Sequence, residues 1–401
     1  MQPMCCPMTL GSDNANDTLT NTPMKLIYCH ADVYNPGGME RVLLNKLRGW
    51  VERGYETMVV TTDQHGRPPF YEFPPEVRMV DLGINYKDDN DKNPIAKTLG
   101  YLRKRRKHRQ ALTELLMRER PDIVVSLFPS ESSFIPDIQD GSLKMLELHF
   151  NKQFRLQYNR KGLLGLADRI RTKQDERLVR KFDNFIVLTR QDAEMWGDLP
   201  NLSVMPNAVV TAPHIEHKSD NHRVIAVGRL DYQKGFDRLL DAWALIPAEL
   251  RKFWRLDIFG QGEWEEKLKQ QIMTLGIGES AAVNQPTDRI FDEYAASDFL
   301  VMTSHYEGFP MVMIEAMACG VPTVCFDFLC GPRDIIANGI NGITVPEGNL
   351  QALSTAMQQL MEHPEQLARM SEQAKRISEE FSQEVIMRRW DLFMNDQLRK
   401  R

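Results

Sequence analysis

The sequence predicts an α/β protein in which two doubly wound parallel sheets face one another across a central cleft. Short apolar runs alternate with helical patterns, which is typical of parallel strands covered by helices. The alternation starts near Met24 and starts again after Asn207, so two such domains are expected. A chain of 401 residues is long enough for two or three domains, and 42% hydrophobic with 26% charged residues is ordinary globular composition.

The first domain is expected over residues 24–206. Residues 1–23 are polar and have no apolar periodicity, so they are predicted to form a disordered extension. A helix is predicted after Gly38, and two basic segments between later strands also have helical patterns. The predicted buried strands span residues 25–30, 57–61, 121–126, 144–149 and 184–188.

The second domain is expected over residues 207–380, where a polar linker through Asn221 leads into its first strand. Three helices are predicted from Leu350 to the C-terminus, and the last, residues 381–401, is expected to return to the N-terminal domain. Its residues available for burial are Ile386, Trp390, Leu392, Phe393 and Leu398. The other predicted helices begin near Gly235, Glu263 and Pro310, and the predicted strands span residues 223–228, 255–259, 299–302 and 322–326.

Positive charge is concentrated in two segments of a chain whose net charge is −5. Residues 101–120 hold eight basic and two acidic residues, and residues 152–181 hold ten and three. Such segments indicate either a surface for an anionic lipid, nucleic acid or acidic substrate, or a solvated helix face. In the first segment the cations adjoin an apolar stripe, so this helix is expected to rest on an anionic membrane. The stripe consists of Leu112, Leu115, Leu116 and Met117.

No apolar run is long enough to span a membrane, and the N-terminus lacks a secretory signal pattern, so a cytoplasmic location is expected. The six cysteines have no paired CxxC spacing and no histidines placed to complete a zinc site. Asp89-Asn-Asp91 has the spacing of a metal-binding pair but lies in a polar segment, where a solvated loop is the better interpretation. We therefore expect no bound metal.

Candidate site residues should follow strands, because ligands of open α/β sheets bind beyond the carboxyl ends of the strands. Gly37 and Gly38 follow the first strand and let the backbone approach a ligand, with the next helix offering its N-terminal amides to an anion. In the second domain Arg229 and Lys234 lie in one loop after a strand. A planar guanidinium and a compact ammonium together suit a diphosphate, although two solvated loop cations remain the alternative.

The segment from Ser304 to Gly320 carries the strongest signal. Pro310 can begin a helix and Gly320 can end it, and Glu315 then lies among apolar neighbours, where a carboxylate needs a partner or a ligand. A structural salt bridge is the alternative. Glu307 precedes the helix by a few residues, and the helical rise would separate the two carboxylates by roughly 12 Å. That span can bracket a sugar diphosphate, whose phosphates the amides of Gly308, Phe309, Pro310 and Met311 could receive.

These residues resemble glycosyltransferase family 4, the retaining enzymes with a GT-B fold, over most of residues 24–401. The resemblance implies transfer of a sugar from a nucleotide sugar, a UDP-sugar in our expectation, to a glycan or lipid-linked acceptor of cell-envelope polysaccharide, with no cofactor. The motifs that carry it are Gly37-Gly38, Leu188-Thr189, Met205-Pro206-Asn207, Gly228-Arg-Leu with Lys234-Gly235, Phe259-Gly-Gln-Gly262, Glu307-Gly-Phe-Pro through Glu315-Ala, and Gly331-Pro-Arg-Asp-Ile-Ile336.

The resemblance also implies residue roles. Arg229 and Lys234 would contact the donor diphosphate, Glu315 the ribose and Glu307 the donor sugar, while the N-terminal domain would receive the acceptor. His149 resembles the histidine that many relatives place near the donor sugar. The leaving diphosphate would help to remove the acceptor proton, so no separate base is needed.

Two other classes of function compete with this one. Another GT-B reaction, such as nucleotide-sugar epimerisation or phosphorolysis, is the enzymatic alternative. Phosphorolysis needs a longer chain with a pyridoxal lysine, and an epimerase needs more carboxylates facing the sugar. A non-enzymatic protein that binds anionic lipid or nucleic acid is the other, but no recognition module or aromatic RNA-binding pattern accompanies the basic segments. We therefore expect no nucleic-acid partner, and a peripheral position at the inner face of the cytoplasmic membrane.

Overall fold

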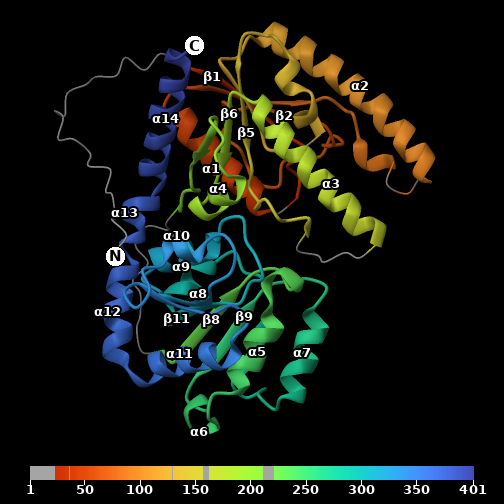
Figure 1. Cartoon of the computed structure of the whole chain (residues 1–401). Coiled ribbons are helices and arrows are strands. Elements are labelled where there is room, and N and C mark those ends of the chain that lie inside the picture. The colour runs from red at the N-terminus through yellow and green to blue at the C-terminus, as the bar shows by residue number, and fades with distance from the viewer. Residues whose placement is uncertain are drawn as a thin grey trace, which may run out of the picture.

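The structure is a computed structural model that describes residues 23–35, 37–89, 91, 93–128, 130–156, 162–210 and 221–401. Its described residues form two parallel sheets with flanking helices, one above the other in Figure 1. The predicted α/β class with two doubly wound sheets is confirmed. The extension predicted for residues 1–23 lies outside the described residues except for Pro23, as do residues 211–220 of the predicted linker.

The first sheet has seven strands, all paired in parallel. Their order in the sheet is the third, second, first, fourth, fifth, sixth and seventh of the chain, so winding reverses direction next to the first strand. The edge strand at residues 78–81 is short and mostly exposed, and it contains too few apolar residues for the sequence pattern to predict it. The strands are β1 Lys25–His30, β2 Glu56–Thr61, β3 Arg78–Asp81, β4 Ile123–Ser126, β5 Leu143–Glu147, β6 Asn184–Val187 and β7 Leu202–Val204.

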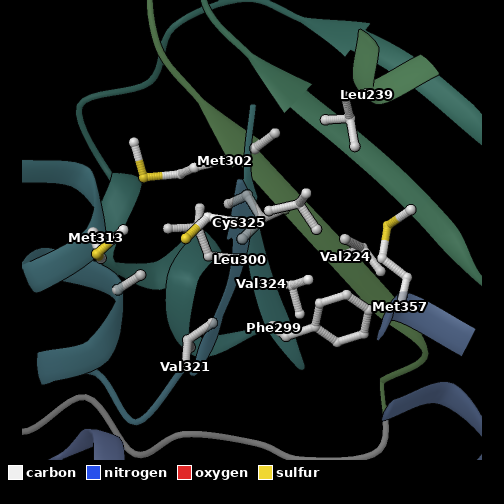
Figure 2. Packing of buried hydrophobic residues seen from close by; sticks show 14 of the residues in the cluster. Val224, Leu239, Phe299, Leu300, Met302, Met313, Val321, Val324, Cys325 and Met357 are labelled. Carbon is white, nitrogen blue, oxygen red and sulfur yellow. The ribbon is translucent and has the colours of Figure 1, made fainter. Parts of the chain in front are cut away.

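The second sheet has six parallel strands wound in the same way, in the order β10-β9-β8-β11-β12-β13. Its central strands are apolar along their length because helices cover both faces. Figure 2 shows this core, where Val224, Phe299 and Val324 pack together with Leu239 and Met357 from the covering helices. The strands are β8 Arg223–Val227, β9 Arg255–Phe259, β10 Ala281–Asn284, β11 Phe299–Met302, β12 Thr323–Phe326 and β13 Gly342–Val345.

Helices connect successive strands and cover the sheets (Figure 1). The α-helices of the first part are α1 Gly38–Glu52, α2 Pro94–Glu119, α3 Gly162–Leu178 and α4 Arg190–Trp196. Those of the second part are α5 Phe236–Ala244, α6 Ala248–Arg251, α7 Glu265–Thr274, α8 Ile290–Ala295, α9 Met311–Ala318 and α10 Pro332–Ile335. Short 3-10 helices are η1 Tyr86–Asp89, η2 Ser130–Ser133, η3 Ile135–Asp137, η5 Val179–Lys181 and η6 Tyr232–Lys234.

The C-terminal part contains four helices rather than the predicted three. They are α11 Leu350–Glu362, α12 Pro364–Ala374, α13 Ile377–Phe381 and α14 Gln383–Arg399. The additional helix is the short α13, which precedes the predicted last helix. The Ser382 hydroxyl caps α14 by accepting a bond from the Val385 amide (3.4 Å). Helix α14 then packs on α1 of the first part, burying Ile386 and Trp390, whereas Leu392 is exposed.

The chain crosses twice between the two sheets, and the crossings touch each other. The Val209 amide donates to the Phe381 carbonyl (2.8 Å), beside the point where α13 gives way to α14. Both connections therefore lie together at one side of the molecule (Figure 1).

The apolar stripe predicted to meet a membrane belongs largely to the protein core. Leu112, Leu115 and Leu116 are buried against β1, β2 and β4, and only Met117 is exposed. The prediction was wrong for the three leucines because helical periodicity shows that a face is apolar without showing what covers it. No helix in the described part of the chain is long and apolar enough to cross a bilayer.

Candidate functional site

A cavity of about 530 Å³ lies between the two sheets, and we call it the interdomain cavity. The first sheet contributes loops that follow β1 and β5, and the second contributes loops that follow β8 and β11. All predicted site residues except Glu315 line it. They are Gly37, Gly38, His149, Arg229, Lys234, Glu307, Gly308, Phe309, Pro310 and Met311.

The loop after β1 forms one wall of the cavity. The Glu40 carboxylate folds back over Gly37, so a Cβ there would lie 1.8 Å from Glu40 Oε2 and the flexible Glu40 side chain would have to move aside. A Cβ on Gly38 would meet nothing within 4 Å. Burial raises the pKa of Glu40, although the hydrogen bond from its own backbone amide acts in the opposite direction and lowers it. This wall therefore presents backbone and open space to the cavity.

The two cations predicted to share a diphosphate differ in their surroundings. The Lys234 ammonium lies 2.7 Å from Glu307 Oε1 and is mostly buried, with 14% of its side chain exposed. Arg229 has 69% of its side chain exposed, donates to Gln233 Oε1 (2.8 Å) and lies 3.3 Å from Asp231. The Asp231 side chain also caps η6 by accepting from the Lys234 amide (3.3 Å). The loop thus holds one cation inside the cavity and leaves the other at its mouth.

Glu307 is the most heavily bonded carboxylate of the cavity. Besides Lys234, it accepts a bond from the Ser304 hydroxyl (2.7 Å) and a longer one from Gln233 Nε2 (3.4 Å). Its backbone carbonyl accepts from Asn151 Nδ2 (2.9 Å), which belongs to the other side of the cavity. Sequence reasoning did not single out Ser304, Gln233 or Asn151, because nothing in their spacing shows that they converge on Glu307.

Gly308 marks the closest approach of the two sides. A Cβ at this position would lie 2.1 Å from the His149 carbonyl oxygen and 2.8 Å from Phe150 Cα. Any side chain would therefore force the loops apart. The next amides are also limited in use, since Pro310 has no N–H and Met311 donates to the Phe309 carbonyl (2.9 Å). Of the four predicted phosphate-binding amides, those of Gly308 and Phe309 remain available.

His149 is held by a buried ion pair that the sequence analysis missed. His149 Nε2 lies 3.2 Å from Glu147 Oε2, and the same carboxylate is bonded to the Lys46 ammonium of α1. The Lys46 ammonium also lies over the Trp390 ring of α14, 4.2 Å from its centroid. A signal existed for Glu147, which stands between apolar residues of a predicted buried strand, where an unpaired charge is costly.

The charges of this pair follow from its burial. Burial opposes the ionised form of Glu147, but Lys46 and His149 outweigh it and lower the pKa of Glu147 to about 2. Burial lowers the pKa of His149, although Glu147 acts in the other direction. A neutral imidazole beside a carboxylate carries its proton on the nitrogen that faces it. His149 therefore donates from Nε2, and Nδ1 holds the lone pair.

Glu315 lies beside the cavity and does not line it. The Tyr294 hydroxyl donates to its Oε2 (3.3 Å), and no ion pair to Glu315 is found among the described residues. Burial raises its pKa, with Arg41 and Tyr294 acting in the opposite direction. Helix α9 begins at Met311, so Glu307 lies in the preceding loop and the helical-rise distance of roughly 12 Å does not apply to it.

No cluster of three metal-binding side chains occurs among the described residues. Asp89 is not in a solvated loop as predicted: it is buried in η1 and lies 2.8 Å from the Lys104 ammonium. Asp91 is exposed. The basic helix α2 supplies the partner that a buried carboxylate requires.

Comparison with known proteins agrees with this architecture. Residues 36–213 match the family model "Glycosyltransferase Family 4" and residues 212–377 match "Glycosyl transferases group 1". The amylovoran biosynthesis glycosyltransferase AmsD of Erwinia amylovora is 30% identical over 278 residues, which cover 64% of this chain and 76% of AmsD.

Solved structures share the fold. The crystal structure of TarM has a TM-score of 0.77 at 16% identity, over 94% of this chain and 99% of TarM. Anabaena HepE, solved in complex with UDP and glucose, has a TM-score of 0.69 at 17% identity, over 93% of this chain and all (100%) of HepE. From its family matches and its relative, the chain belongs to glycosyltransferase family 4 and is a glycosyltransferase with the GT-B fold.

Proposed function

We propose that this enzyme moves a sugar from a UDP-sugar to a glycan or lipid-linked acceptor of cell-envelope polysaccharide, with retention of the anomeric configuration. Residues 207–380 bind the donor, residues 24–206 receive the acceptor, and residues 381–401 brace the N-terminal domain. The observation that carries the proposal is the convergence of Lys234, Glu307 and the free amides of Gly308 and Phe309 in the interdomain cavity, opposite His149. The structure of HepE with UDP and glucose supports the choice of nucleotide.

Each charged residue has a role in donor binding. Lys234 and Arg229 contact the diphosphate together with the two amides, because a guanidinium, an ammonium and N–H groups all donate to phosphate oxygens. Gly37 and Gly38 admit the diphosphate from the other wall. Without donor, Glu307 neutralises Lys234, so the cavity holds no unpaired charge.

Two carboxylates recognise hydroxyl groups. Glu307 accepts from a donor-sugar hydroxyl, and Glu315 accepts from the ribose hydroxyls beyond the edge of the cavity. Tyr294 already orients the Glu315 carboxylate. His149 faces the donor sugar, and Glu147 fixes its orientation.

In the transfer step the bond between the anomeric carbon and the diphosphate oxygen breaks, and the acceptor oxygen bonds to the same face of that carbon. The acceptor proton passes to the departing diphosphate oxygen. Lys234, Arg229 and the amides stabilise the charge that develops on the diphosphate. No protein base is required on this route.

The experiment is a donor screen with the full chain. UDP-, GDP- and ADP-sugars are incubated with the enzyme, and sugar and nucleotide products are measured by mass spectrometry. Consumption of a UDP-sugar is expected. Consumption of only GDP- or ADP-sugars would overturn the nucleotide assignment, interconversion of sugars without release of UDP would indicate epimerisation, and an inverted product by NMR would overturn retention.

We also propose peripheral binding to the inner face of the cytoplasmic membrane, on a face of α2 different from the predicted stripe. Leu99 and Leu102 are 63% and 55% exposed, and Arg103 and Arg106 lie on the same side one turn away. Other cations of this helix are engaged with the protein: Lys104 with Asp89, Arg105 with Ser133 and Lys107 with the Gly83 carbonyl.

Binding to vesicles that contain anionic lipid tests this face. Replacing Arg103 and Arg106 by Gln should weaken binding, since each cation near an anionic surface contributes roughly 1 kcal/mol. Replacing the exposed Lys252 and Arg289 of the other domain by Gln is the matched control. Equal binding by all three proteins would contradict the proposal.

A further inference from the structure

Two further cavities lie along α3. The first, which we call the serine groove, has a volume of about 610 Å³ and lies between η2 and α3. The second, the tryptophan groove, has a volume of about 310 Å³ and lies between α3 and Trp196 of α4. Neither groove contains a residue of the proposed donor site.

Aromatic rings link the interdomain cavity to the serine groove. Phe150 and Phe154 line the interdomain cavity and lie 4.0 Å apart between ring centroids. Phe128, which lines the serine groove, meets Phe150 edge to face at 5.4 Å. Phe128 has a φ of 67°, a left-handed conformation that is rare for a bulky side chain. The three packed rings therefore lie where the two cavities adjoin, with two of them lining the interdomain cavity and one lining the serine groove.

Arg177 links the serine groove to the tryptophan groove, because it lines both. The interdomain cavity, the serine groove and the tryptophan groove therefore lie next to one another in this order, on a path that leaves the interdomain cavity and follows α3. We call this path the α3 track. In Figure 1, α3 extends from the first domain away from the chain crossings.

The α3 track carries positive charge that no carboxylate of the described residues balances. Asp175 is bonded to Arg155, and Glu176 lies 2.8 Å from the Lys152 ammonium. Among the described residues, the exposed cations Lys173, Arg177 and Arg180 have no ion-pair partner. All three line the tryptophan groove.

We propose that the α3 track binds the distal part of an acceptor chain that carries phosphodiester groups. This inference rests on the proposed function, because the reacting end of the chain must enter the interdomain cavity. Guanidinium groups and serine hydroxyls suit phosphate oxygens, and Ser130, Ser132 and Ser133 line the serine groove. The aromatic wall suits the apolar faces of the sugar or polyol units between phosphates.

The test uses soluble glycerol-phosphate oligomers of increasing length as the probe and measures their dissociation constants by calorimetry. Longer oligomers should bind more tightly, because each added unit reaches further along the track, and added salt should weaken binding. Replacing Lys173, Arg177 and Arg180 together by Gln should weaken binding of long oligomers about tenfold, since three partly screened charge contacts are lost.

A matched control removes the same charge elsewhere. Lys252, Arg289 and Lys375 are exposed cations of the other domain, and their joint replacement by Gln should change oligomer affinity less than twofold under the same screening. Equal losses in both triple variants would show a general charge effect and overturn the track. Affinity independent of oligomer length would overturn it as well.

Two further probes, a neutral oligosaccharide series and anionic vesicles, distinguish phosphate recognition from binding of sugars or of a membrane. A neutral oligosaccharide series that binds as tightly as the glycerol-phosphate series would overturn the phosphate assignment. Binding to anionic vesicles that is lost in the track variant, without oligomer binding, would assign these cations to a membrane instead. Hydrolysis of UDP-sugar by the unmodified enzyme is measured in parallel: its absence defeats the proposed function, whereas its presence with unchanged oligomer binding by the track variant defeats only the α3 track.

Discussion

Lys46 and Glu147 form a buried ion pair whose removal gives a quantitative test of the site. In Lys46→Met the Glu147 carboxylate stays buried without its cation, and breaking such a pair from one side costs roughly 3–5 kcal/mol. For a domain of this size each kcal/mol lowers the melting temperature by about 2–4 °C, so a decrease of about 6–20 °C is expected in the transition of the first domain. Calorimetry of the full chain measures it.

Two variants make this test specific. Arg48→Met changes an exposed cation of the same helix and should alter stability by less than about 0.5 kcal/mol. The double variant Lys46→Met with Glu147→Gln removes both charges, so it should recover most of the lost stability. If the double variant were as unstable as Lys46→Met, or if Arg48→Met were equally harmful, the ion-pair argument would be refuted.

The pair also predicts a pH dependence. The pKa of Glu147 is about 2 in the folded protein, below its ordinary value of 4.5, so the folded state favours the ionised form. Its contribution of about 3 kcal/mol to the free energy of unfolding is present above pH 4.5 and is lost as the pH falls toward 2.

In Glu147→Gln, His149 keeps a neutral partner but loses the carboxylate, so kcat should fall while UDP affinity stays unchanged. A loss of UDP affinity equal to the loss of kcat would contradict an orienting role.

Three further changes test other parts of the molecule. Glu315→Ala should weaken binding of free UDP about tenfold to hundredfold, since a charge-assisted hydrogen bond is worth roughly 1.5–3 kcal/mol. Glu307→Ala should instead depress transfer and leave UDP affinity within about threefold. Equal UDP affinities in the wild type and both variants by calorimetry would defeat the two assignments. Gly308→Ala should separate the two loops and lower kcat more than about tenfold, because its Cβ would lie 2.1 Å from the His149 carbonyl oxygen. Gly278→Ala is the control that should retain activity, because its Cβ would meet only Ile272, at 3.8 Å. Glu131→Gln should gain stability relative to the wild type as the pH rises from 5 to 7, because burial raises the folded pKa of Glu131 from 4.5 to about 7, so the unfolded carboxyl ionises in this range while the folded one keeps its proton. A stability difference that stays constant across this range in thermal unfolding would refute the assignment.

The sequence was sufficient for the two parallel sheets and the position of most strands. Runs such as residues 223–227 are apolar along their length, and each is followed by a helical pattern, so the local period identifies both elements. Strands β3, β7, β10 and β13 escaped prediction because they are the edge strands of the two sheets, where burial is incomplete and the apolar run is correspondingly weak. The short helix α13 was missed because five residues are too few to show a helical period.

Half of the residues that line the interdomain cavity were also predicted, since they follow strands whose carboxyl ends meet at one edge of each sheet. Only the tertiary structure decided their partners. Lys234 and Glu307 are 73 positions apart, and Lys46 and Glu147 are 101 apart, so no local period relates them. Local sequence fixes which side chains point out of a strand or helix, whereas the packing of one sheet against the other determines which charges meet and which are buried. The pKa of a carboxylate depends on that second step, because burial raises it and a nearby cation lowers it.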